Sequence, residues 1–353
     1  MVDIWKWVSD TQEDLTHQGH HRLAHLMELL SFYTVTENHV QVDAMVPEAL
    51  ALARSLKKPW IEVFIRHWHL QSRVLHRYDV TDILPEAVSL LEFAHHEETR
   101  DCPQSICVVQ DLTNCCGTAD GPGYAEERLA VAKETLAKID VTWPCFICIS
   151  AEYASALVDG KRYEEALTFL KQQAHALLLA NQYEAHLMLR DREIEALVRL
   201  QRYEDAYAIN QLACGRNESK SDRLSTAIAE ACITAYLGRY EEGKQALPDF
   251  ATIATTPSYY LDWAEAAKLL AEATVIPNDC HLDAKFQHMS DTLSQNGVVR
   301  EAFTITLRQA ELALKRGQQK TATACCERAE ALIPRLRKPL DAPQLLAEMR
   351  AKI

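Results

Sequence analysis

One tetrapeptide pattern occurs three times in this 353-residue chain, as Arg162-Tyr163-Glu164-Glu165, Arg202-Tyr203-Glu204-Asp205 and Arg239-Tyr240-Glu241-Glu242. The three tyrosines are thus spaced at a nearly constant interval of about 40 residues, and a fixed period of this size indicates an array of structural repeats. In such an array each repeat packs mainly on its neighbours. The period therefore determines the expected fold before any single residue is considered.

The residues around each copy have the periodicity of a helix. Apolar residues recur near every 3.6 positions before and after the tyrosine, and the alternating period of a strand is absent. The acidic residues that follow the tyrosine favour the positive end of a helix. Three residues after it comes a small residue, which lets two helices approach closely: Ala166, Ala206 or Gly243. Each copy thus predicts a helical hairpin, with its tyrosine as a structural wedge at the start of the second helix.

The repeat extends in both directions. Tyr124 precedes Tyr163 by one period, and Gln319 follows Tyr240 by two. The copy between Tyr240 and Gln319 should fall near residue 280. That segment lacks the landmark residues but carries a helical apolar stripe, namely Leu282, Phe286, Met289 and Leu293.

This pattern resembles the tetratricopeptide repeat (TPR) family, which places an aromatic residue at the hairpin turn and a small residue three positions later. The resemblance implies an all-α fold, a TPR-like right-handed α-solenoid of stacked antiparallel helix pairs. The period here is longer than that family's usual length of about 34 residues. The longer helices that it implies resemble those of TPR-like superhelices in bacterial signalling and regulatory proteins. We expect one solenoid over 1–353, with degenerate repeats or a cap at 1–100, recognisable repeats at 101–335 and a capping helix at 336–353.

The composition disfavours several classes of partner. The net charge of −13 opposes nonspecific binding to nucleic acid or to an anionic membrane. The chain contains no run of 18 apolar residues, so we expect no transmembrane helix. The N-terminus lacks the basic segment and apolar core of a secretory signal. Eleven cysteines in a helical chain are typical of reduced thiols, and we expect a cytoplasmic protein.

Two groups of residues raise the question of metal binding. Six cysteines fall between Cys102 and Cys148, but they contain only one CxxC motif, whereas a zinc site commonly needs four converging ligands. His17, His21 and His25 share one helical face without an accompanying metalloprotease motif. Apolar packing of the thiols and a polar histidine stripe are the favoured interpretations. Because no nucleotide loop or nucleophile motif is present either, we expect no cofactor and no enzymatic activity.

In TPR arrays the first helix of each pair lines the concave face. Counting back from Tyr203 and Tyr240 places six residues on or near that face: Met188, Asp191, Arg192, Glu195, Arg199 and Tyr236. Such a mixture of apolar and charged groups suits a peptide or an amphipathic helix with basic anchors. In the alternative, these residues only pack against the next hairpin, and Arg199 neutralises Glu195 one helical turn away.

Two functions remain open at this stage. The first is a non-catalytic scaffold or adaptor that binds a protein or peptide on its concave face. The second is a regulatory protein that senses a ligand or peptide and changes its superhelical curvature. A sensor should bring polar groups together around its ligand, whereas a scaffold should present an open surface.

Overall fold

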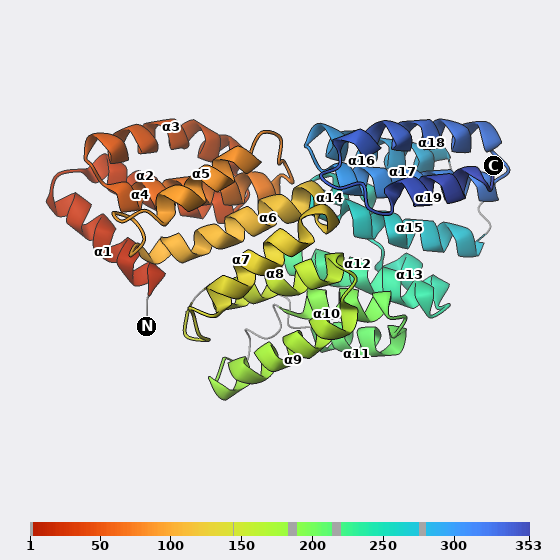
Figure 1. The fold of residues 1–353 in the computed structure, drawn as a ribbon, viewed down its shortest axis with the longest axis horizontal. Helices are drawn as coiled ribbons and strands as arrows, with labels where there is room; N and C mark the ends of the chain where they lie inside the picture. Colours follow the sequence, from red (N-terminus) through yellow and green to blue (C-terminus); the bar gives the residue numbers. More distant parts are fainter. Residues whose placement is uncertain (1–2, 144, 183–188, 214–219, 275–279) are drawn as a thin grey trace.

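The structure is a computed structural model that describes residues 3–143, 145–182, 189–213, 220–274 and 280–353. Every regular element in these residues is helical (Figure 1). Most of the helices form an alternating series of eight first helices and eight second helices, and a first helix with the second helix that follows it makes one pair along the chain. The first helices of the pairs are α2 (His21–Val35), α4 (Pro59–Gln71), α6 (Val108–Asp120), α8 (Phe146–Asp159), α10 (Arg190–Arg199), α12 (Lys220–Tyr236), α15 (Tyr260–Thr274) and α17 (Val299–Lys315).

The second helices and the remaining elements complete the array. The second helices are α3 (His39–Ser55), α5 (Leu84–Ala94), α7 (Ala125–Leu136), α9 (Tyr163–Leu179), α11 (Tyr203–Ala213), α13 (Tyr240–Ala246), α16 (Cys280–Gln295) and α18 (Gln319–Leu332). The terminal helices and short connecting helices are α1 (Ile4–His17), η1 (Ser72–His76), η2 (Pro103–Cys107), η3 (Pro122–Tyr124), α14 (Phe250–Ala254), η5 (Pro257–Tyr259), η6 (Ile333–Arg335) and α19 (Ala342–Arg350).

The first helices form one continuous layer, which we call the inner layer. Each packs on the first helix of the next pair, in the order α2, α4, α6, α8, α10, α12, α15 and α17. The second helices pack on this layer, each against its own first helix, except α16, which packs on α17, the first helix of the next pair. The chain is thus the all-α, TPR-like solenoid of paired helices that the repeat predicts. None of the helices in the described segments is long and apolar enough to cross a membrane.

The same turn ends the first helix of the repeated hairpins. One residue adopts the left-handed conformation, with φ of 59° at Lys161, 60° at Gln201 and 77° at Gly238. The next N–H then bonds to a carbonyl five residues back, as from Arg202 to Leu197 at 2.9 Å. This geometry satisfies the carbonyls that a helix end leaves free. The tyrosine follows immediately and begins the second helix, as predicted.

The small residues and the stripe near residue 280 are in the predicted places. Ala166 and Ala206 are fully buried. A Cβ added to Gly243 would lie 3.0 Å from the side chains of Leu270 and Thr234, so glycine permits the close approach there. Helix α16 begins one period after Tyr240, and all four apolar residues of its stripe are buried.

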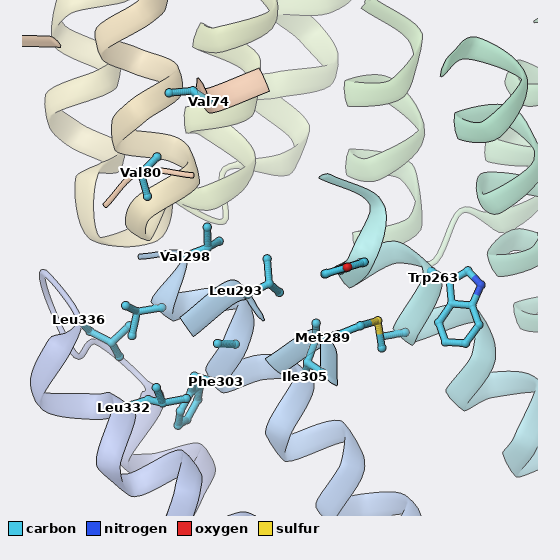
Figure 2. Close-up of a cluster of buried hydrophobic side chains, with 14 of the residues drawn as sticks. Val74, Val80, Trp263, Met289, Leu293, Val298, Phe303, Ile305, Leu332 and Leu336 are labelled. Atoms are coloured by element: carbon cyan, nitrogen blue, oxygen red, sulfur yellow. The ribbon is translucent and has the colours of Figure 1, made fainter. Parts of the chain in front are cut away.

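The inner layer also closes on itself, because α17 packs against α6. The six first helices α6, α8, α10, α12, α15 and α17 thereby form a ring, and we use that name below. Figure 2 shows the apolar part of the closure, where Val74 and Val80 of the N-terminal half lie above Val298 and Leu293. A backbone hydrogen bond also connects the two sides of the closure, because the Val80 N–H donates to the Asn296 carbonyl at 2.8 Å.

A buried carboxylate completes the closure at the end of α6. Asp120 is only 2% exposed. It accepts hydrogen bonds from the Arg300 guanidinium at 2.8 Å and from the backbone N–H groups of Gly123 at 3.2 Å and Arg337 at 2.8 Å. One side chain therefore connects α6 to both α17 and the segment before α19.

Candidate functional site

Charged side chains of the inner layer gather around the ring. We call eight of them the inner charged cluster: Asp159, Arg192, Glu195, Arg199, Asp262, Glu265, Glu301 and Arg308. They come from α8, α10, α15 and α17. The charge of Asp159 on α8 acts on the carboxyl of Glu301 on α17, so groups from non-adjacent helices are close enough to interact. The cluster contains five carboxyl groups against three guanidiniums, so acidic groups predominate in it.

Glu265 is the best satisfied member of the cluster. Arg308 pairs with it, and the Tyr236 hydroxyl donates to it at 2.6 Å. Burial acts to raise the pKa of Glu265, but the charge of Arg308 and the Tyr236 hydroxyl hold that pKa below its ordinary value. Tyr236 is itself fixed by stacking on Tyr203, with ring centroids 4.7 Å apart and planes within 1°. Glu265 and Tyr236 are therefore held in a fixed arrangement by their neighbours.

Asp159 forms an ion pair with the buried Arg128 at another position of the ring. The Arg128 guanidinium of α7 is buried and pairs with Asp159 and, at 3.4 Å, with Glu152. Burial raises the pKa of Asp159 despite the opposing charge of Arg128, and the negative charge of Glu195 raises it further. Burial and Glu195 therefore disfavour the charged form of Asp159, whereas the Arg128 guanidinium favours it.

Asp262 differs from these groups because its side chain has no hydrogen-bond or ion-pair partner in the described segments. It retains contact with solvent. Nevertheless, burial by the surrounding helices and the charge of Glu195 raise its pKa to about 6, against the opposing charges of Arg192 and Arg199. Asp262 is thus an unpaired carboxyl whose charged form is disfavoured by its surroundings.

Glu301 lies where the ring closes. The Tyr78 hydroxyl donates to its Oε1 at 2.8 Å, whereas Oε2 is buried and has no partner among the described residues. Burial raises the pKa of Glu301 to about 8; Tyr78 opposes this shift, and the charges of Asp262 and Asp159 add to it. At neutral pH this carboxyl therefore holds its proton in most molecules.

The predicted groove residues lie at or beside this cluster. Arg192 donates to Glu195 at 3.1 Å and is its ion-pair partner among the described residues. The charge of Glu195 also acts on Arg199, as in the alternative interpretation. Arg199 is exposed, and its guanidinium has no hydrogen-bonded partner in the part of the chain described. Asp191 accepts from Ser225 at 2.9 Å, which connects α10 to α12. Met188 lies outside the described residues.

Sequence reasoning did not find the members contributed by α15 and α17. Asp262 and Glu265 belong to the hairpin near residue 280, whose turn lacks the landmark residues that allow positions to be counted. Glu301 lies near the charges of Asp262 and Asp159, and it meets Tyr78, which is 223 residues away in the chain. The repeat period carries no information about contacts at that separation.

The two groups considered for metal binding show no assembled site. His17, His21 and His25 line a groove of about 700 Å³ along α1 and α2, with Glu13 and Glu28 at its edge. In the described segments, no group of three or more His, Cys, Asp or Glu side chains is arranged to hold an ion.

The thiols in the described residues are free and mostly buried. Burial raises the pKa of Cys102 to about 11 and that of Cys148 to about 12. Cys107 and Cys145 are in direct contact, with their Sγ atoms 2.6 Å apart.

The sequence matches no protein-family model and no curated protein. Solved structures do match it. A tetratricopeptide repeat protein from Parabacteroides merdae is 14% identical, with 83% of this chain and 99% of that chain covered and a TM-score of 0.47. A Rap protein, solved in complex with Competence and Sporulation Factor, is 13% identical, with 94% of this chain and 100% of that chain covered and a TM-score of 0.51. Together with the paired helices, the likeness to the Rap protein over nearly the whole chain identifies the fold as a TPR-like superhelix.

Proposed function

We propose that this chain is a non-catalytic, cytoplasmic binding protein whose inner charged cluster takes a peptide or protein segment with basic side chains. One observation carries the proposal. Asp262 and Arg199 both reach solvent within the cluster, and neither side chain has a partner in the described segments. Carboxylates outnumber guanidiniums in the cluster even when Glu301 holds its proton. The electrostatic potential of the cluster therefore favours a cationic ligand.

We further propose that the protein is a sensor in preference to an open scaffold. The cluster is assembled from helices on both sides of the closure, and Glu301 contacts Tyr78 there. A ligand that binds at Asp262 would therefore contact or influence groups that hold the ring together. If it binds one arrangement of the α6–α17 contact more tightly than another, it will shift the protein toward that arrangement. The Rap protein of similar fold was solved with Competence and Sporulation Factor, which supports this class of function by analogy only.

The proposal can be tested with a randomised peptide library displayed on phage and selected against the full-length protein. We expect the retained peptides to be enriched in Lys or Arg. Replacing Asp262 and Glu195 together, by Asp262→Asn and Glu195→Gln, should reduce their affinity by tenfold or more, about 1.4 kcal/mol. The matched control is Glu164→Gln on the outer helix α9, where the side chain is exposed. Equal affinity of wild type and the folded double variant would place the binding surface elsewhere.

The sensor and scaffold interpretations separate in a second measurement. With a selected peptide bound, hydrogen exchange of residues 72–83 and 295–301 should change if ligand binding is coupled to ring closure. Unchanged exchange in both segments, with the peptide still bound at Asp262, would favour a passive scaffold.

A further inference from the structure

Two cysteines from different hairpins meet in the interior of the protein. Cys107 is the last residue of η2, directly before α6, and Cys145 directly precedes α8. Their Sγ atoms are 2.6 Å apart, and the two residues are 8% and 2% exposed. In the sequence, Cys145 stands in a CxxC motif with Cys148. The fold instead places Cys145 against a residue 38 positions earlier.

We propose that Cys107 and Cys145 form a reversible disulfide, so that this pair is an oxidation site of the protein. The oxidant is a small-molecule disulfide such as glutathione disulfide. One cysteine thiolate attacks a sulfur of the oxidant and releases one glutathione thiol. The second cysteine then attacks the mixed disulfide and releases the other. Two protein thiols lose two protons and two electrons, and one glutathione disulfide becomes two molecules of glutathione.

The surroundings of the pair determine how fast this exchange proceeds. The contact with Cys145 and burial both raise the pKa of the Cys107 thiol. Since the thiolate is the attacking species, the folded protein should react slowly. The bond should form while the chain folds, or when this region opens. Once formed, it is shielded from reductants by the same burial. The pair would therefore keep a disulfide formed during folding or opening, and it would react only slowly to a change in oxidant concentration.

The position of the bond gives it a structural consequence. It would enclose the hairpin of α6 and α7 and join the start of α6 to the start of α8. These two helices are neighbours in the inner layer, and α6 also packs against α17 at the closure. Oxidation should therefore fix the spacing of two ring helices that remain adjustable in the reduced protein. This inference does not depend on the proposed ligand.

The test is to refold the full chain in a glutathione redox buffer, alkylate the remaining thiols and map the linked peptides by mass spectrometry. Wild type should lose two alkylatable thiols and yield one peptide pair that joins Cys107 to Cys145. Cys148→Ser is the matched control, because it removes the CxxC motif and should leave the bond intact. Cys107→Ser should abolish the bond, with no linkage between Cys145 and Cys148 in its place.

The oxidised wild type should also show a higher thermal midpoint than the reduced protein, a difference absent in Cys107→Ser. A linkage between Cys145 and Cys148 in wild type, or no loss of thiols at Cys107 under oxidising refolding, would overturn the proposal. The mapping of wild type decides by itself if Cys107→Ser does not fold.

Discussion

Tyr203 illustrates how a repeated residue supports the architecture. Its ring is half-buried and stacks on Tyr236, the last residue of the next first helix. Removing it takes away part of a buried ring and one aromatic pair. We expect Tyr203→Ala to lower the free energy of unfolding by about 2 kcal/mol in denaturant titrations. Tyr203→Phe keeps the ring and should cost much less. If Tyr203→Ala left stability unchanged but abolished binding of a selected peptide, Tyr203 would be a ligand contact.

Glu301 should give the protein a measurable dependence on pH. Its pKa is about 8 in the folded state, against an ordinary value of 4.5. The folded state thus binds the proton more tightly, and the associated stability is present below pH 4.5 and is lost as the pH rises through 8. Tyr78, Arg308, Asp159 and Asp262 are the titratable or charged groups that act on it.

The variant Glu301→Gln keeps a neutral group of the same size at every pH. We expect its free energy of unfolding to match wild type near pH 4 and to exceed wild type near pH 9, because only wild type then holds an unfavourable charge. Chemical denaturation at both pH values measures the difference. If the free energy of unfolding changed equally with pH in the two proteins, Glu301 would have an ordinary pKa.

At the scale of the helical element, the turns offer a test of backbone strain. Gln201 occupies the left-handed position that Gly238 fills in the next hairpin. A side chain is disfavoured in that conformation, whereas glycine adopts it readily. Gln201→Gly should therefore stabilise the protein by about 0.5–1 kcal/mol. The mirror variant Gly238→Ala should destabilise it by a similar amount, although no atom lies within 4 Å of the added Cβ. Thermal unfolding of both variants is the measurement, and a loss of stability in Gln201→Gly would contradict the expectation.

The elements are also where prediction from the sequence succeeds. Tyr163, Tyr203 and Tyr240 locate three second helices because a local pattern specifies a local turn, and the start of α16 follows by adding one period. Asp191, Arg192, Glu195 and Arg199 share α10 for the same reason. The site is harder to predict, because Asp262 and Glu301 reach it through packing between helices far apart in the chain. Local patterns specify hairpins but not which hairpins meet.

At the scale of the whole molecule, Asp120 should be the residue on which closure depends most. Replacing it by Asn removes the charge that holds Arg300, whose side chain is only 12% exposed. Breaking a buried pair of this kind costs about 3–5 kcal/mol. The control is Asp341→Asn, which breaks an exposed pair with Lys161 in the same region and should cost no more than about 1 kcal/mol. Hydrogen exchange of residues 295–301 should increase in the Asp120 variant only.

The contact between α17 and α6 changes how the array should unfold. A linear solenoid loses its terminal repeats one at a time, because each repeat depends only on its neighbours. In this chain the repeats from α6 to α17 form the ring and have no free end, so opening any one of them removes contacts that the whole ring needs. They should melt as one cooperative unit, while α1, α2 and α3 fray independently. Deleting a repeat inside the circle should therefore cost far more stability than the loss of one hairpin, whereas deletion at the N-terminal end should not.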